Sequence, residues 1–383
     1  MKIAFLTSEY PHSKTGFAAG IGTSIMNLSK GLISNGHEVI VVVYGQDKDE
    51  KFIENSITFY KIKNIKFKGF SRLFTQKKIQ QLLNTLALNG EIDLVEAADW
   101  TGITSKIKLK CPLIVKLHGS DTYFCHLDNR SVKTLNKIRE KKALLNADGL
   151  LSVSQYTADV TKQLFSLKTD FTIIPNGIDT TKFQVDDMVK PNENTILYFG
   201  TLIRKKGLLE LPLIFNAIFN RNNNAKLVLI GRDASDVISG NNSTWAMMQS
   251  LFDVDALQNV TYLGSISYDQ IKSHINTATV CVFPTFAEAL PVSWIEAMAM
   301  QKAIVASNIG WATEIIEDNV DGFLVHPKNH NLFADRILEL LDNPKLRNDF
   351  GKQARKKVIE KFSIDVVAKQ SIAFYSNNLK GKK

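Results

Sequence analysis

Short apolar runs alternate with longer amphipathic stretches along the first half of the chain. The apolar runs have the length of buried β-strands, and stretches with helical periodicity, such as 21–35 and 133–146, lie between several of them. Strands that alternate with helices form βαβ units, so this pattern predicts a parallel sheet with helices packed on its faces. The six expected strands are 3–7, 38–44, 94–97, 113–118, 149–153 and 172–174.

The alternation stops near residue 180 and then resumes. Residues 181–194 are polar, contain Pro191 and lack periodicity, which is typical of a linker. Because 383 residues suffice for two domains, we expect an α/β fold with Rossmann-like domains at 1–180 and 195–364 and a C-terminal helix at 365–383. The second series has expected strands at 195–200, 225–230, 260–263, 279–283, 303–306 and 322–325, and helices at 292–300, 332–341 and 346–362.

The composition is that of a globular protein, with 44% hydrophobic and 22% charged residues. No apolar run reaches the length of a membrane span, and the first ten residues read as a strand rather than a signal peptide. Cys111, Cys125 and Cys281 have neither metal-site nor disulfide-framework spacing. We therefore expect a cytoplasmic protein.

The net charge of +9 is concentrated in the first half of the chain. Residues 1–180 hold 24 Lys and Arg against 17 Asp and Glu, whereas residues 181–383 hold 23 against 21. The run 61–78 has seven basic residues, no acidic residue, and Phe67, Phe70 and Phe74 among them. One interpretation is a solvated strand followed by a helix whose Phe face is core. Another is a patch that attracts anionic lipid headgroups, which would place the protein at the inner face of the membrane. Nucleic-acid binding is less favoured, because no recognisable motif accompanies the charge.

Two carboxylates, Glu288 and Glu296, are the first candidates for chemistry. Glu288 lies in the loop after the expected strand 279–283, and Glu296 lies in the helix 292–300. Ligands of α/β sheets bind at the carboxyl ends of the strands, where two such carboxylates can accept hydrogen bonds from sugar and ribose hydroxyls. On spacing alone, a solvated loop residue and a charge on a helix face explain the pair equally well.

The residues around this pair, 283–299, resemble the E-x7-E signature of the retaining nucleotide-sugar glycosyltransferases of family 4 (glycosyl transferases group 1), which have the GT-B fold. Further family-like blocks follow in the expected order over nearly the whole chain. The resemblance implies two facing Rossmann-like domains with a central cleft, and a C-terminal helix that crosses back to the first domain. These blocks are 174–179, 199–207, 303–310 and 314–327, together with the N-terminal residues.

The resemblance also implies roles for the donor-side residues. Glu296 would accept hydrogen bonds from the ribose, and Glu288 would contact sugar hydroxyls near the reacting carbon. The family often has glycines after the first Glu, whereas Pro291 of this chain has no N–H, which leaves the Leu290 N–H as a donor. The sugar is therefore expected to be held differently from the commonest pattern.

The segment 199–207 supplies positive charge for the diphosphate of the donor, on whose oxygens negative charge builds during transfer. Lys206 matches the family's lysine. The family's arginine directly follows the glycine, where this chain has Thr201, so we assign its bidentate phosphate grip to Arg204. No Asp-x-Asp metal site accompanies the segment, and we expect no metal or other cofactor.

The first half of the chain holds the remaining candidates. Gly20 matches the family's phosphate-facing glycine, although a plain turn explains that loop as well. His118 matches a histidine that lies near the transferred sugar, although a lone His at a strand end is more often structural. Glu96, Asp99 and Trp100 can face an acceptor, with Trp100 stacked on a sugar ring or buried as packing.

The resemblance therefore implies a retaining glycosyltransferase that moves a sugar from a nucleotide-sugar donor to a glycan or lipid-linked acceptor, in the synthesis of surface polysaccharide or lipopolysaccharide. Two alternatives remain on the same architecture. One is a sugar-nucleotide epimerase or a phosphorylase, although no pyridoxal lysine is identifiable. The other is a non-catalytic nucleotide-sugar-binding protein, which the departures at Thr201 and Pro291 leave open.

Overall fold

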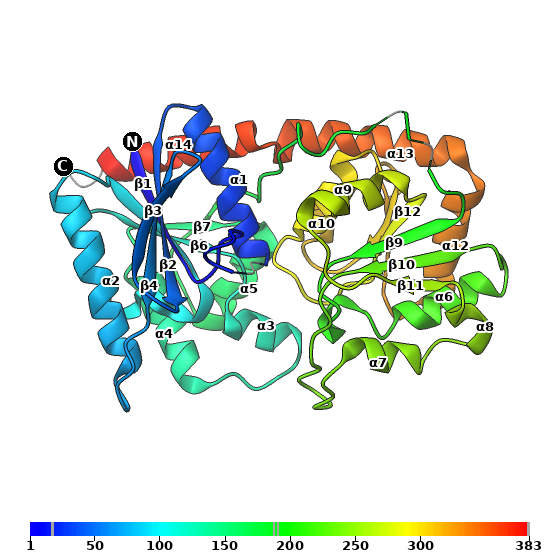
Figure 1. Ribbon diagram of the computed structural model, residues 1–383, viewed down its shortest axis with the longest axis horizontal. Coiled ribbons are helices and arrows are strands. Elements are labelled where there is room, and N and C mark those ends of the chain that lie inside the picture. The colour runs from blue at the N-terminus through cyan, green and yellow to red at the C-terminus, as the bar shows by residue number, and fades with distance from the viewer. Residues whose placement is uncertain (17–18, 187, 190, 381–383) are drawn as a thin grey trace. The chain divides into compact units, whose positions relative to one another are not determined.

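The computed structural model describes residues 1–16, 19–186, 188–189 and 191–380, and the chain divides into two units (Figure 1). Unit 1 comprises Met1–Gly177 and Phe362–Lys383, and unit 2 comprises Ile178–Lys361. The boundaries therefore lie three residues before those expected at 180 and 365. Segment 181–194 belongs to unit 2, because its backbone is fastened there: the Asn192 N–H donates to the Thr277 carbonyl at 2.8 Å.

Unit 1 is an eight-stranded sheet with the order β3-β4-β2-β1-β5-β6-β7-β8. Every strand pair is parallel except β3 with β4, a hairpin at the sheet edge that the sequence patterns did not predict. The strands are β1 (Lys2–Thr7), β2 (Glu38–Gln46), β3 (Glu50–Glu54), β4 (Ile57–Lys63), β5 (Leu94–Ala98), β6 (Leu113–Leu117), β7 (Gly149–Ser152) and β8 (Thr172–Ile173). The helices are α1 (Gly20–Ser34), α2 (Ser71–Leu88), the 3-10 helix η1 (Trp100–Lys106), α3 (Asp121–Leu127), α4 (Thr134–Leu145), α5 (Gln155–Phe165) and α14 (Ile364–Lys380).

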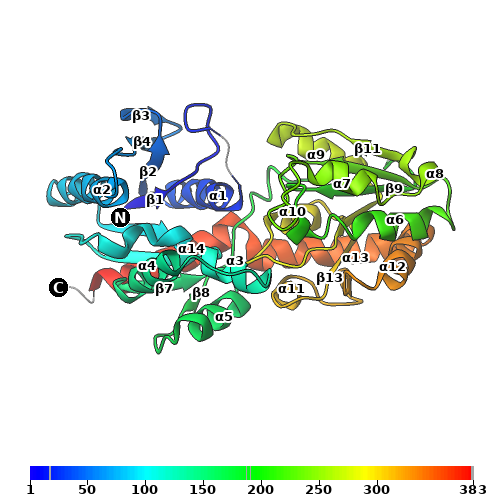
Figure 2. The same cartoon turned by 90° about the horizontal axis from the view of Figure 1, so that it is seen from below.

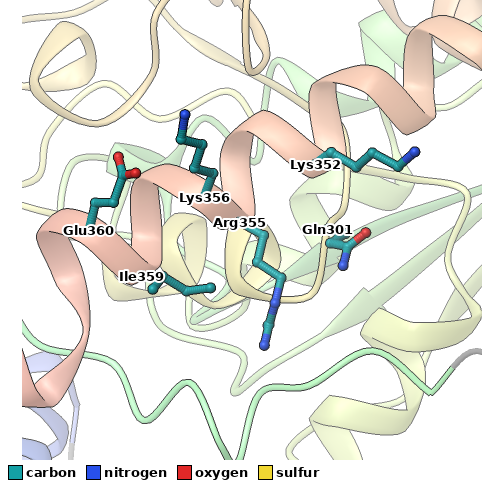
Figure 3. A pocket seen from close by; sticks show the side chains of 6 residues that line it. All are labelled: Gln301, Lys352, Arg355, Lys356, Ile359 and Glu360. Carbon is teal, nitrogen blue, oxygen red and sulfur yellow. The ribbon is translucent and has the colours of Figure 1, made fainter.

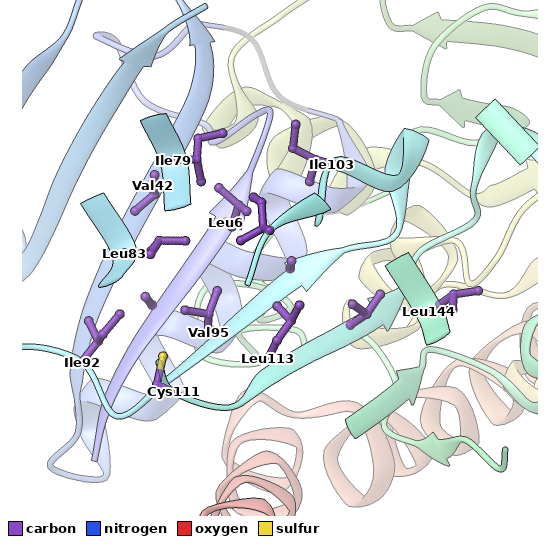
Figure 4. Close-up of a cluster of buried hydrophobic side chains, with 14 of the residues drawn as sticks. Leu6, Val42, Ile79, Leu83, Ile92, Val95, Ile103, Cys111, Leu113 and Leu144 are labelled. Atoms are coloured by element: carbon purple, nitrogen blue, oxygen red, sulfur yellow. The ribbon is translucent and has the colours of Figure 1, made fainter. Parts of the chain in front are cut away.

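The sheet of unit 1 has a hydrophobic core on each face, because side chains alternate along its strands. Leu6 of β1 lies in the core that includes Leu83 of α2 (Figure 4). Phe5, the preceding residue, lies in the core on the other face, with Leu28 of α1 and Val367 of α14. The C-terminal helix is therefore part of the first unit, as the family resemblance implies.

The contact between α1 and α14 depends on Gly31. A Cβ atom at this position would lie 2.8 Å from the Cβ of Ala368 and 2.9 Å from the carbonyl oxygen of Ile364. In proteins a Cβ atom essentially never lies this close to another heavy atom, so any larger residue would push the helices apart. The glycine lets the two helices pack in direct contact.

Unit 2 is a six-stranded parallel sheet with the order β11-β10-β9-β12-β13-β14. Helices α6 and α12 lie side by side on it (Figure 2). The strands are β9 (Thr195–Phe199), β10 (Lys226–Ile230), β11 (Val260–Tyr262), β12 (Val280–Phe283), β13 (Ile304–Ser307) and β14 (Phe323–Val325). The helices are the 3-10 helix η2 (Arg204–Lys206), α6 (Leu211–Phe219), α7 (Thr244–Gln249), α8 (Val254–Leu257), α9 (Tyr268–Thr277), α10 (Val292–Ala299), α11 (Ala312–Ile315), α12 (His330–Asp342), α13 (Pro344–Lys357) and the π-helix η3 (Val358–Phe362).

In unit 2 the neighbours of β9 are β10 and β12, which lie far from it in the sequence. Parallel strands in register place their carboxyl ends at one edge of the sheet, so the loops after β9, β10 and β12 meet there. Among the described helices, none combines the length and the hydropathy that crossing a membrane requires.

Candidate functional site

The loops that follow β9 and β12 are fastened to one another. Gly207 has a φ of +72°, and a Cβ atom there would lie 1.7 Å from the carbonyl oxygen of Pro284, so the two backbones touch. Two residues from this contact, the Phe286 N–H donates to the Lys205 carbonyl at 2.8 Å. These contacts fix residues 204–207 beside 284–288.

Lys206 and Glu288 form an ion pair at this junction, with Nζ 2.8 Å from Oε1. Their side chains are 22% and 15% exposed, so the pair is shielded from water but reachable. Burial alone would raise the pKa of Glu288, yet the charges of Lys206 and Lys205 outweigh burial and lower it. The structure thus brings together a predicted phosphate-binding cation and a predicted sugar-binding carboxylate.

Arg204 makes a different contact from the one expected. Its Nε and Nη2 donate to the two carboxylate oxygens of Asp236, at 2.8 and 2.7 Å. The Arg204 hydrogen bonds, followed by those from Ser239, hold the pKa of the buried Asp236 well below its ordinary value. The bidentate fork assigned to phosphate is therefore occupied by Asp236, which leaves the other N–H groups of the guanidinium for a ligand.

Glu296 lies on α10 and is almost fully buried. The Tyr268 hydroxyl donates to its Oε1. Burial raises the pKa of Glu296 to about 7, against the opposing effects of Tyr268, Lys182 and Lys206. No motif identified Tyr268; the signal for its helix is the capping box of Ser267 and Gln270.

Leu290 lies in the same loop as Glu288, directly before Pro291, which is the N-cap residue of α10. The Leu290 side chain is buried, which holds this part of the loop against the core. Its role as an amide donor to the sugar stays a prediction.

In unit 1, Gly20 is the first residue of α1, and residues 17 and 18 of the preceding loop lie outside the described residues. A Cβ at Gly20 would meet no atom within 4 Å, so the space beside it is open. However, Glu9 Oε1 already accepts hydrogen bonds from the Ala19 and Gly22 N–H groups, at 3.1 and 2.9 Å. The helix start thus has a carboxylate where the resemblance places a phosphate, and no sequence pattern pointed to Glu9.

His118 follows β6 and is half-buried. Burial, and then the charge of Lys116, lowers the pKa of its imidazole to about 3, so the ring is neutral at physiological pH. Its backbone N–H donates to Asp99 Oδ1 at 2.9 Å. A neutral imidazole can donate to one sugar hydroxyl or accept from another.

Asp99 is buried, and burial raises its pKa to about 7. It therefore supports the backbone of His118 rather than presenting a charge at a surface. Trp100 begins η1 and is half-buried, so its ring is neither fully packed nor free.

The prediction that Glu96 faces an acceptor is wrong. Its side chain is buried, and the Tyr375 hydroxyl of α14 donates to its Oε2 at 2.5 Å. Burial raises the pKa of Glu96 and lowers that of the neighbouring buried Lys116. Glu96 thus lies on the sheet face that α14 covers, and its role is to hold that helix.

The run 61–78 does not form a helix whose Phe side chains lie in the core. The buried face of α2 is formed by Ile79, Leu83 and Leu86, whereas Phe67 and Phe70 are 56% and 54% exposed. Three basic residues of the run have structural contacts: Lys61 pairs with Asp47, Lys78 pairs with Asp49, and Arg72 donates to the Thr101 carbonyl. The exposed basic residues are Lys63, Lys66, Lys68 and Lys77.

A pocket of about 280 Å³ lies in unit 2 along α13 and η3, and none of the predicted site residues lines it (Figure 3). The Arg355 guanidinium is directed to the carbonyls of Phe183 and Ala299, so its donors are used within the fold. Within the described ranges, no three His, Cys, Asp or Glu side chains gather as a metal site would require. The pocket is lined by Gln301, Lys352, Arg355, Lys356, Ile359 and Glu360.

Comparisons with known proteins cover both units. The family model described as glycosyl transferases group 1 matches residues 179–357, and the glycosyltransferase family 4 model matches residues 18–182. The chain is 27% identical to an uncharacterized glycosyltransferase of Methanocaldococcus jannaschii, over 98% of both proteins. It is 28% identical to the capsular polysaccharide biosynthesis glycosyltransferase CapM of Staphylococcus aureus, over 54% of both.

Solved structures show the same fold. Sucrose-phosphate synthase from Thermosynechococcus elongatus matches over 100% of both chains, with a TM-score of 0.79 and 19% identity. HepE from Anabaena, in complex with UDP and glucose, matches over 98% of this chain and 99% of that chain, with a TM-score of 0.75 and 19% identity. The two Rossmann-like units therefore form the GT-B fold.

The Arg204–Asp236 contact predicts a pH-dependent loss of stability in Asp236→Asn. Because the folded-state pKa of Asp236 is depressed, its carboxylate contributes stability above its ordinary pKa of 3.8, and this contribution is lost as the pH falls below that value. At pH 7 the variant should lose about 2 kcal/mol of unfolding free energy in urea denaturation. The difference from the wild type should shrink towards pH 3.

The matched control is Asp335→Asn, which breaks the exposed pair with Arg221 on the same unit. An exposed pair should change stability by less than about 0.5 kcal/mol. Equal losses for the two variants, or a difference that does not respond to pH, would contradict the role given to Asp236.

Proposed function

Because the chain belongs to the glycosyl transferases of group 1, we propose that it moves a sugar from a nucleoside diphosphate to a hydroxyl of a glycan or lipid-linked acceptor, with retention of configuration. The observation that carries the proposal is the ion pair of Lys206 and Glu288 at the carboxyl ends of β9 and β12. A nucleotide sugar has a diphosphate for the lysine and an adjoining sugar for the carboxylate.

Each charged group then has a role in the transfer. Lys206 binds the diphosphate and stabilises the charge that grows on its oxygens as the sugar bond breaks. Glu288 accepts hydrogen bonds from the sugar and favours positive charge on the reacting carbon. Glu296 accepts hydrogen bonds from the ribose.

Retention follows when the acceptor attacks the face that the diphosphate leaves. The leaving diphosphate oxygen then takes the proton of the acceptor hydroxyl. Lys206 supplies positive charge for the diphosphate, so the proposal includes no metal or other cofactor. The relation to CapM supports surface polysaccharide as the product.

The proposal predicts that Lys206→Ala lowers the affinity for the nucleotide sugar about 30-fold or more, since removing one partner of a shielded charge contact costs about 2 kcal/mol or more. A thermal-shift screen of UDP, GDP, ADP and their sugars identifies the donor first. Titration calorimetry then compares the wild type with Lys206→Ala and with Lys226→Ala, which removes an exposed lysine of the same unit.

Lys226→Ala should bind like the wild type. A Lys206→Ala protein that retains wild-type affinity would refute the donor assignment. Turnover of the donor at full rate without any acceptor would instead indicate an epimerase.

We propose further that the exposed aromatic and basic residues between β4 and α2 bind an anionic membrane surface. Phe67 and Phe70 lie 6.3 Å apart between ring centres, and Phe67 packs edge-on against Phe74 at 5.3 Å. Exposed aromatic side chains beside lysines insert at the headgroup level, while the lysines attract anionic lipids. Such an attachment suits an enzyme whose acceptor is carried on lipid.

The Phe67→Ser/Phe70→Ser double variant should therefore lose most of its co-sedimentation with vesicles that contain phosphatidylglycerol. Val237→Ser/Ile238→Ser is the matched control, because it removes two exposed apolar side chains, 71% and 59% exposed, from unit 2. The control should bind like the wild type. Wild-type protein that binds neutral and anionic vesicles equally would contradict the proposal.

A further inference from the structure

Tyr268 is fixed at the start of α9 by its local sequence. Ser267 caps the helix by accepting the Gln270 N–H, and the Gln270 side chain accepts the Ser267 N–H. This reciprocal cap sets Tyr268 as the first helical residue. Its hydroxyl reaches α10, where it donates to Glu296 Oε1.

Two further contacts hold the Tyr268 ring, and each contacting residue is itself held by a partner. Lys182 Nζ lies 4.5 Å from the ring centre and forms an ion pair with Asp269 at 2.6 Å. The ring of the buried Phe183 packs edge-on at 5.6 Å. Phe183 is held in turn by Arg355, whose Nη1 donates to its carbonyl at 2.9 Å. The side chain of Tyr268 is therefore held between α10 and the segment that begins unit 2.

We propose that Tyr268 is a positioning residue for the ribose of the donor: its phenol holds one oxygen of Glu296 and orients the carboxylate so that the other oxygen meets the ribose hydroxyls. Within the described part of the chain, Tyr268 is the one side chain that hydrogen-bonds Glu296. The inference rests on the proposed function, which gives Glu296 its ligand.

The electrostatics of the clamp add a pH dependence. The groups that act on Glu296 are Tyr268 from α9, Lys182 from the segment before β9, and Lys206 from η2. All three favour the carboxylate, whereas burial favours the acid and sets its pKa at about 7. A ribose diol donates to a carboxylate, so donor affinity should fall as the pH falls through about 7.

Burial, followed by Glu296 and then by the smaller effects of Asp179 and Asp269, raises the pKa of Tyr268. The phenol therefore stays protonated and remains a donor throughout this pH range. Without the phenol, the pKa of Glu296 rises, and the pH at which donor affinity is half lost moves upward.

The test is Tyr268→Phe, assayed on the full chain with the donor found by thermal shift. The loss of one hydrogen bond to a charged group should raise the KM and the Kd for the donor about tenfold. The kcat should change less than about twofold, because the phenol touches no reacting atom. The pH profile of donor binding should shift to higher pH.

A double-mutant cycle shows whether Tyr268 acts through Glu296. Adding Tyr268→Phe to Glu296→Gln should cause no further loss of affinity. In Glu296→Gln and in the double variant, donor affinity should no longer fall as the pH falls through about 7. Tyr60→Phe, which removes a phenol from unit 1, is the control and should bind like the wild type. Should Tyr268→Phe fail to fold, Lys182→Met tests the same clamp and should weaken binding about threefold.

Unchanged affinity in Tyr268→Phe, or a full additional loss in the Glu296→Gln background, overturns the inference and leaves the proposed function intact. A wild-type protein that binds no nucleotide sugar overturns the proposed function as well.

Discussion

The ion pair of Lys206 and Glu288 is the interaction on which the candidate donor site depends. Both side chains are mostly buried, so either charge would be costly without its partner. In the structure they neutralise each other across two loops. A donor with an anionic diphosphate next to a hydroxyl-rich sugar can replace each partner by a complementary group. A ligand without both parts would leave one charge uncompensated.

Backbone contacts between the two loops place this pair. β9 and β12 are neighbours in the sheet, and Gly207 permits the loop after β9 to touch the carbonyl of Pro284. The other candidate carboxylate of unit 2, Glu296, is held by a side chain instead, because it accepts a hydrogen bond from the Tyr268 hydroxyl. Preorganised charges of this kind favour binding and transfer because little has to reorganise when the ligand arrives.

The sequence predicted those parts of the molecule that depend on local pattern. The alternation of strands and helices predicted both sheets, because strands buried on both faces read as continuous apolar runs. It did not predict the β3–β4 hairpin, whose strands are partly exposed. Family-like spacing predicted Lys206 and Glu288, which the structure brings together.

The partners of the candidate residues could not be predicted, because they are distant in sequence and their contacts arise only on folding. Asp236 accepts the bidentate hydrogen bonds of Arg204. Glu9 accepts hydrogen bonds from backbone N–H groups at the start of α1. The Tyr375 hydroxyl of the last helix donates a hydrogen bond to the buried Glu96. The sequence left the exposure of Phe67 undecided, because this residue precedes α2 and helical periodicity gives no information about its side chain.

The most direct test of this account is the affinity of Glu288→Gln for the nucleoside diphosphate alone, measured by calorimetry beside the wild type. Removing the carboxylate charge frees Lys206 and removes a repulsion from the phosphates, so the variant should bind the diphosphate about tenfold more tightly, although it transfers sugar poorly. Equal or weaker binding of the diphosphate by Glu288→Gln would contradict the claim that this pair forms the phosphate and sugar site.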